Sequence, residues 1–200
     1  MNKIRLACCL LLLGMISFDS LGIAGTADSP KEKAVLFICT GNFYRSRLAE
    51  ALFNFYSSKN NSAWKAFSRG LDLTTLTPSQ KQSRISELTI KGLESLEVPT
   101  SFAGGRPTQL TVSDLDRSSI IVALNQSEHR PVLEKKYPAQ KSKITYWEIG
   151  DSKTLNPTQA IELINNNVKA IWHCFIYSNN LVAIAIYTHI FCTNSLLPRH

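Results

Sequence analysis

A cysteine and an arginine stand six positions apart near the start of the chain, at Cys39 and Arg45. Small polar residues lie between and beside them, at Gly41, Asn42 and Ser46. A thiolate can attack phosphorus, and a guanidinium can hold two phosphate oxygens at once. These residue types point to phosphate chemistry with Cys39 as the nucleophile and Arg45 as the phosphate clamp. The alternative is that Cys39 is only a small buried hydrophobe at the end of a strand.

The placement of this loop makes the pattern specific. Ala34–Ile38 is a short apolar run, typical of a strand buried on both faces, and apolar residues recur at helical spacing from Arg45 onward. A loop between such a strand and helix gathers backbone N–H groups and the positive end of the helix dipole around one point. That field binds a phosphate dianion and favours a thiolate at its centre. The expected phosphate-binding residues are Thr40, Gly41, Asn42, Phe43, Tyr44, Arg45 and Ser46.

Three side chains of the loop have distinct expected tasks. Gly41 lets the backbone approach the phosphate closely. Arg45 stabilises the equatorial charge that develops as phosphorus passes to sulfur. The Ser46 hydroxyl can donate to the sulfur of Cys39 and help it leave when the covalent intermediate is hydrolysed.

Strand and helix patterns alternate along the rest of the chain, which predicts a three-layer α/β fold with a parallel sheet and helices on both faces. Asn125 and Glu128 have the spacing of a capping box, and His129 is expected on the solvated side of that helix. The expected strands are 34–38, 64–68, 118–124 and 144–149. The expected helices are 45–59, 80–96, 125–135 and one that starts at Asn156 or Thr158 and continues through Val168.

The beginning of the chain is typical of a signal peptide. Residues 1–25 carry Lys3 and Arg5, then an apolar run, then small residues suited to cleavage near Gly25 or Ala27. We therefore expect an exported protein, periplasmic or secreted. An uncleaved leader of this kind would instead act as a membrane anchor.

The end of the chain is apolar and is interrupted by polar residues. Between Lys169 and Arg199 there is no Asp, Glu, Lys or Arg. Residues 172–200 are a poor membrane anchor, an extra core element or a tail foreign to the domain, and we favour the last interpretation. The domain itself is then expected to span residues 33–171.

The distribution of charge indicates which classes of partner the chain can bind. Twenty-two Lys and Arg against 15 Asp and Glu give a formal net charge of +7, but the basic residues are scattered. Nucleic-acid binding has no specific support, whereas a positive field suits an anionic substrate. No His, Cys and Asp spacing suggests a metal site, so we expect neither a metal nor another cofactor.

The motif resembles the opening of the low-molecular-weight protein tyrosine phosphatase family. The resemblance rests on Val35–Asn42, Arg45-Ser46 and Ala49-Glu50, and it continues at lower density from Lys33 to Ile171. It implies a flavodoxin-like fold with a four-stranded parallel sheet. It also implies metal-free hydrolysis of a phosphomonoester through a phosphocysteine intermediate, with a phosphorylated protein, above all one with phosphotyrosine, or a small aryl phosphate as substrate. Residues that match Asn42, Ser46 and Ser68 hold the phosphate loop in shape in that family.

Three positions depart from the family pattern. The family often has a second cysteine just before the arginine, used for reversible disulfide protection, where this chain has Tyr44. Arg47 replaces a usual proline. Around Phe102, where the family often has a histidine that braces the loop, this chain has none.

The resemblance also implies a general acid, which protonates the leaving oxygen and later activates water. In the family it is an aspartate on a loop near the chain end, usually followed by proline. The matching residue is Asp151, followed here by Ser152, directly after the fourth predicted strand. Glu148 is the alternative, although it lies within the strand pattern. The composition around Asp151 is also ordinary for a turn.

Two other functions stay open. Arsenate reductases of the phosphatase-like type have a similar first loop, but they need two further cysteines in mid-chain, and none lies between Cys39 and Cys174. The chain could also be a non-catalytic module that binds phosphate or a phosphoprotein. The presence of Cys39, Arg45 and Asp151 together argues against that reading.

Overall fold

The computed structural model describes residues 33–177. The predicted signal peptide, residues 1–25, and residues 178–200 of the predicted tail lie outside this range. Four parallel strands form one sheet in the order β2-β1-β3-β4, which confirms the predicted fold class. The strands are β1 (Ala34–Cys39), β2 (Lys65–Gly70), β3 (Ile120–Ala123) and β4 (Ile144–Tyr146).

Strand β1 lies between β2 and β3, and all six of its residues are apolar and buried. Its side chains alternate between two hydrophobic clusters, one on each face of the sheet. Phe37 and Cys39 belong to one cluster, and Leu36 and Ile38 belong to the other. Cys39 therefore ends the strand on the same face as Phe37.

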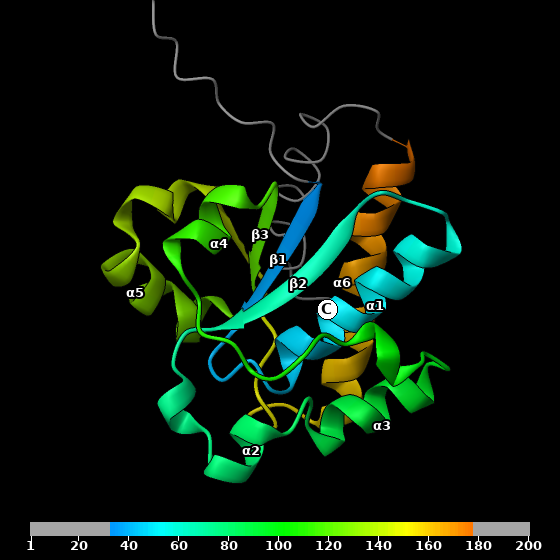
Figure 1. Cartoon of the computed structure of the whole chain (residues 1–200), viewed down its shortest axis with the longest axis horizontal. Helices are drawn as coiled ribbons and strands as arrows, with labels where there is room; N and C mark the ends of the chain where they lie inside the picture. Colours follow the sequence, from blue (N-terminus) through cyan, green and yellow to red (C-terminus); the bar gives the residue numbers. More distant parts are fainter. Residues whose placement is uncertain (1–32, 178–200) are drawn as a thin grey trace, which may run out of the picture.

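Helices cover both faces of the sheet (Figure 1). Helices α1 (Arg45–Lys59) and α6 (Pro157–Tyr177) pack together on the face of Phe37 and Cys39. Helices α4 (Val112–Arg117) and α5 (Gln126–Lys136) lie on the other side (Figure 1). Short 3₁₀ turns at Leu73–Thr75, Thr100–Phe102 and Pro138–Lys143 join the larger elements.

The segment predicted as one helix over 80–96 forms two helices, α2 (Pro78–Gln82) and α3 (Glu87–Ser95). The break has a local cause, because Ser83 and Ser86 are both extended. The Ser86 side chain accepts a hydrogen bond from the Thr89 N–H at 3.1 Å and so caps a new helix. Both helices lie below the ends of β1 and β2 in Figure 1.

Helix α6 continues past Ile171, where the sequence pattern places the end of the domain. Trp172 and Cys174 are buried, and the Trp172 ring meets that of Phe53 edge-on at 5.6 Å. The first residues of the predicted tail are therefore part of the core, and the domain extends beyond the predicted boundary. Within residues 33–177, no helix is long and apolar enough to cross a membrane.

Candidate active site

Cys39 is the last residue of β1, and α1 begins at Arg45. The structure thus places residues 39–46, the Cys39–Ser46 loop, at the carboxyl end of the central strand, between strand and helix. The Cys39 Sγ lies 2.9 Å from the Ser46 Oγ. Both residues are buried, with 4% of Cys39 and none of Ser46 exposed. A hydroxyl is thereby within hydrogen-bond reach of the sulfur.

Asn42 holds the loop in shape. Its φ of 53° is in the left-handed region, which asparagine tolerates better than most residues. Its Nδ2 donates to the Ser46 Oγ at 3.1 Å and to the Ser68 Oγ at 2.7 Å. Its Oδ1 accepts from the Thr108 N–H at 2.9 Å. The three residues expected to support the loop, Asn42, Ser46 and Ser68, are therefore in direct contact.

The first helical turns of α3 hold the outer part of the loop. The Phe43 carbonyl accepts from the Ser86 N–H at 3.0 Å, and the Thr89 hydroxyl lies within 3.3 Å of the Phe43 and Tyr44 carbonyls. The Tyr44 hydroxyl donates to the Pro157 carbonyl at 3.5 Å. Tyr44, at the position where the family often has cysteine, thus links the loop to the start of α6.

Arg45 is 95% buried, since its exposed fraction is 5%, and it makes three hydrogen bonds. Its Nη1 and Nη2 donate to the two carboxylate oxygens of Glu128, at 3.1 and 2.6 Å. Its Nη1 also donates to the Ile149 carbonyl at 2.8 Å. Burial on its own would lower the pKa of Arg45. The hydrogen bond with Glu128 and the charges of Cys39, Glu128 and Asp151 outweigh burial and raise it.

The hydrogen bonds of Arg45 leave one edge of its guanidinium without an acceptor among residues 33–177. A guanidinium has five N–H donors in a fixed plane, and three of them are used. The Nε–H and the second Nη2–H have no partner among residues 33–177, and they lie side by side on one edge. Two parallel donors on one edge can bind two oxygens of one phosphate group.

Glu128 and His129 differ from their predicted roles. Asn125 does cap α5, since its Oδ1 accepts from the Glu128 N–H at 2.9 Å. The Glu128 carboxylate, however, does not return to the Asn125 N–H but binds Arg45. The Nδ1 of His129 accepts from that N–H at 3.1 Å instead. The predicted capping box was therefore wrong, because a charge-assisted bond to Arg45 is stronger than a return bond to the backbone. The prediction of a solvated His129 was also wrong, since the ring is buried and bonded to the Asn125 N–H.

His129 is fully buried and lies beside the loop. Its Nε2 is 3.4 Å from the Thr40 Oγ1 and 3.6 Å from the Glu128 carboxylate. Burial, aided by the charge of Arg45, lowers the pKa of His129 to about 3. The ring is thus neutral, with Nδ1 as acceptor and the proton on Nε2, where it faces Thr40 and Glu128.

Asp151 lies in the segment between β4 and α6. Its Oδ1 accepts from the Lys153 N–H at 2.8 Å, and its carbonyl accepts from the Leu155 N–H at 2.8 Å, so it does form a turn. Its charge nevertheless acts on Arg45, and Ile149, two residues earlier, is hydrogen-bonded to Arg45. The turn leaves Oδ2 without a hydrogen bond to any of residues 33–177. The side chain of the alternative acid, Glu148, is exposed overall, although the partial burial of its carboxyl raises its pKa.

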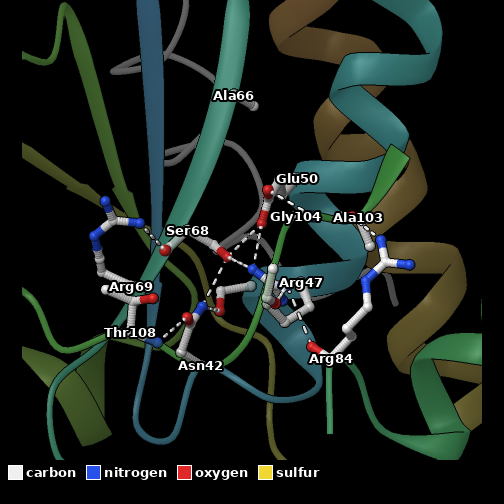
Figure 2. A network of polar contacts seen from close by, with 12 residues as sticks. Asn42, Arg47, Glu50, Ala66, Ser68, Arg69, Arg84, Ala103, Gly104 and Thr108 are labelled. Atoms are coloured by element: carbon white, nitrogen blue, oxygen red, sulfur yellow. Dashed lines mark hydrogen bonds and ion pairs between the residues drawn. The ribbon is translucent and has the colours of Figure 1, made fainter. Parts of the chain in front are cut away.

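Sequence reasoning missed a buried ion pair behind the loop (Figure 2). The Arg47 Nη1 donates to the Glu50 carboxylate at 3.0 Å, and both side chains are buried. Ser68 donates to the same carboxylate at 2.6 Å. The replacement of proline by Arg47 was the only sequence signal of this pair. In the part of the chain that the structure describes, no three His, Cys, Asp or Glu side chains gather as a metal site would require.

The fold is that of a flavodoxin-like α/β protein. Residues 34–154 match the family described as low molecular weight phosphotyrosine protein phosphatase. Because this match covers more than half of the chain, the chain belongs to the low molecular weight phosphotyrosine protein phosphatase family and is an enzyme of this type. None of the curated proteins compared with the chain matches it.

Solved structures share the fold. A low molecular weight protein tyrosine phosphatase from T. tengcongensis is 24% identical, with a TM-score of 0.57 over 68% of this chain and 95% of its own. YfkJ from Bacillus subtilis is 22% identical, with a TM-score of 0.62 over 74% and 96%. A mutant of YwlE, described as an arginine phosphatase, is 14% identical, with a TM-score of 0.60 over 74% of this chain and 99% of its own.

Proposed function

We propose that this phosphatase hydrolyses phosphomonoesters of the phosphotyrosine type through a phosphocysteine intermediate on Cys39. The observation that carries the proposal is the 2.9 Å contact between the Cys39 Sγ and the Ser46 Oγ. It joins the two ends of the Cys39–Ser46 loop, which leads from β1 into α1. Such a loop concentrates donors and positive charge around the sulfur, which favours a thiolate and a bound phosphate together.

In the first step, the Cys39 thiolate attacks phosphorus and forms the P–S bond. The P–O ester bond breaks, and its electron pair stays on the leaving oxygen. Asp151, in its protonated form, gives that oxygen a proton, so the product is a neutral alcohol or phenol. Arg45 holds two of the nonbridging oxygens with its free Nε–Nη2 edge while phosphorus is transferred.

In the second step, the Asp151 carboxylate takes a proton from water as the water oxygen attacks phosphorus. The P–S bond breaks, and its electron pair returns to sulfur as a thiolate. The Ser46 hydroxyl donates a hydrogen bond to that sulfur and makes it a better leaving group. Inorganic phosphate leaves, and the enzyme returns to its starting state.

The substrate class can be tested directly. Purified protein should release p-nitrophenol from p-nitrophenyl phosphate with no added metal and in the presence of a chelator. Cys39→Ser should lose turnover, because a serine hydroxyl is not ionised by this loop, but it should still bind vanadate. Loss of turnover on chelation would overturn the phosphocysteine mechanism and favour a metal-dependent one.

A panel of substrates separates the alternatives. Phosphotyrosine and phosphoserine peptides test the proposed class, and a phosphoarginine peptide tests the activity for which YwlE is named. Arsenate with thioredoxin tests the reductase alternative, for which residues 40–173 supply no cysteine. Binding of phosphopeptide without any turnover would identify a non-catalytic module.

We also propose that residues 1–25 direct export and are removed near Gly25 or Ala27. The order of basic, apolar and small residues supports this. Mass spectrometry of the protein recovered from its native compartment tests it. A mature protein that retains Met1–Arg5 would exclude cleavage.

A further inference from the structure

We infer that Arg47 is a positioning residue whose guanidinium, paired with Glu50, sets the direction of the hydrogen bonds that end at the sulfur of Cys39. The inference rests on the proposed function, in which Ser46 donates to that sulfur. Arg47 and Glu50 do not touch the Cys39 sulfur themselves. They act through Ser68, Asn42 and Ser46.

The two charges are held where water does not reach. Only 3% of Arg47 and 4% of Glu50 are exposed, and both lie on α1 at positions i and i+3. Burial lowers the pKa of Arg47 and raises that of Glu50, and each partner's charge opposes the change. The other charges that act on the pair are those of Arg69, Arg84 and Cys39. Replacement of a buried ion pair by well-packed apolar side chains is often neutral or stabilising, so stability alone does not account for this pair.

The pair gives the hydrogen-bond chain a direction. An ionised carboxylate only accepts, so Ser68 must give Glu50 its single hydroxyl proton, over 2.6 Å. The Ser68 oxygen is then free to accept from the Asn42 amide at 2.7 Å. The same amide donates to Ser46 at 3.1 Å. Ser46 therefore keeps its own proton for the Cys39 sulfur, at 2.9 Å.

A neutral Glu50 would no longer fix the direction of these hydrogen bonds. A protonated carboxyl can donate to Ser68, whose own proton would then point toward Asn42. The amide nitrogen cannot accept that proton, so the Asn42 amide would have to turn over, with its Oδ1 facing Ser68 and Ser46 and its bond to the Thr108 N–H lost. The charge of Arg47, 3.0 Å from the carboxylate, favours the ionised form on which the direction depends. Figure 2 shows Arg47, Glu50, Ser68 and Asn42 joined in this way behind the loop.

Arg47 also braces the segment that carries Phe102. Its Nη2 donates to the carbonyls of Arg84 and Gly105, the first at 3.2 Å. Glu50 accepts from the Gly104 N–H at 3.0 Å, on the same segment. Two departures from the family pattern thus meet here, because Arg47 stands where proline is usual and reaches the segment that lacks a bracing histidine.

The test compares Arg47→Met with Arg47→Lys, Glu50→Gln and a control, Arg84→Met. Arg84 donates to the Ala103 carbonyl at 2.8 Å, so its variant loses a charge near the pair and a bond to the same segment but keeps every hydrogen bond from Glu50 to the Cys39 sulfur. Two readouts are used. The first is kcat and KM for p-nitrophenyl phosphate. The second is the pH profile of iodoacetate alkylation at Cys39, followed on its peptide by mass spectrometry.

We expect Arg47→Met to lower kcat by about 10- to 100-fold, as misplacement of a catalytic group does, with a smaller change in KM. Its alkylation profile should move to higher pH, because the thiolate loses its donor. Arg47→Lys should keep much of the wild-type kcat and of the wild-type alkylation profile, since it keeps a charge beside Glu50. Glu50→Gln should resemble Arg47→Met, and Arg84→Met should resemble the wild type.

Two results would overturn the inference. One is an Arg47→Met variant whose alkylation profile is that of the wild type. The other is an Arg84→Met variant that loses as much activity as Arg47→Met. If Arg47→Met does not fold, Arg47→Lys and Glu50→Gln give the same comparison. Alkylation does not need turnover, so a wild-type protein without phosphatase activity would refute the proposed function and leave this inference to be judged on the profiles.

Discussion

The guanidinium of Arg45 and the carboxylate of Glu128 form a two-bonded ion pair, with N–O distances of 3.1 and 2.6 Å. Glu128 thereby occupies the end of the guanidinium and leaves the Nε–Nη2 edge for phosphate. The pair joins the first residue of α1 to the first turn of α5, on the opposite face of the sheet. Glu128 thus fixes the orientation of the group that is proposed to bind the transferred phosphoryl.

Glu128→Gln tests this role. An amide offers one acceptor where the carboxylate offers two, so Arg45 should lose its fixed orientation. We expect kcat for p-nitrophenyl phosphate to fall by roughly 10- to 100-fold. The matched control is Glu134→Gln on the same helix. Glu134 pairs with the exposed Arg130, so this variant should keep the wild-type kcat. Wild-type kcat in Glu128→Gln would show that Arg45 needs no second anchor.

Arg45→Lys should be severely impaired, although the charge is kept. An ammonium cannot supply two parallel donors to phosphate, nor replace the bonds to Glu128 and Ile149 at the same time. Inhibition by vanadate should weaken together with kcat. Arg130→Lys, on the exposed side of α5, is the control for replacing an arginine by lysine and should keep wild-type kcat and vanadate inhibition. Near-normal vanadate inhibition in Arg45→Lys would refute the clamp.

Asp151→Asn should slow the cleavage of poor leaving groups most. A good leaving group departs without a proton, whereas an alkoxide or phenoxide needs one. We expect phosphotyrosine cleavage to fall by roughly 10²- to 10⁴-fold and an activated aryl phosphate to lose much less. Glu148→Gln, made in parallel, should affect neither. Equal losses on both substrates would mean that Asp151 acts only through its turn, and a selective loss in Glu148→Gln would move the acid to that residue.

His129 makes stability depend on pH. Its pKa is about 3 in the folded chain and about 6.5 when unfolded, so the unfolded state binds one more proton between these values. Stability should therefore be complete above about pH 6.5 and fall as pH decreases toward 3. The contribution of this residue is about 1.4 kcal/mol per pH unit at most.

His129→Asn keeps an acceptor near the Asn125 N–H and removes the titrating ring. Urea unfolding of wild type and variant at several pH values between 4 and 7 would measure the difference. The slope of unfolding free energy against pH should be shallower in His129→Asn, whatever its absolute stability. Parallel slopes would show that His129 is not held neutral.

Much of the fold and the centre of the site follow from short-range patterns. The six apolar residues of β1 place that strand at the centre of the sheet, and the residues that follow define the loop around Cys39. Both signals lie within a dozen positions, so the sequence expresses them directly. The same holds for Asn125, which caps α5 as its spacing indicates.

The missed features depend on partners distant in sequence. Glu128 fits a capping box locally, but Arg45, 83 positions away, is the stronger partner. Arg47 is only a departure from a pattern until the carbonyl of Gly105, 58 positions later, is placed beside it. The helix predicted over 80–96 breaks because Ser86 caps a new turn and its N–H donates to Phe43. The periodicity of apolar residues along the chain does not indicate such long-range contacts.

The burial of Trp172 determines how far the protein can be shortened. Its ring closes a line of aromatic side chains that passes through Phe53 and Phe37 to Trp147, two residues before the carbonyl that holds Arg45. A chain cut after Ile171 would lose this ring and leave a gap against Phe53. Loss of a buried aromatic side chain costs about 3–5 kcal/mol, a large part of the 5–15 kcal/mol that keeps a domain folded. Truncated forms made for crystals or spectra should therefore keep α6 through Tyr177.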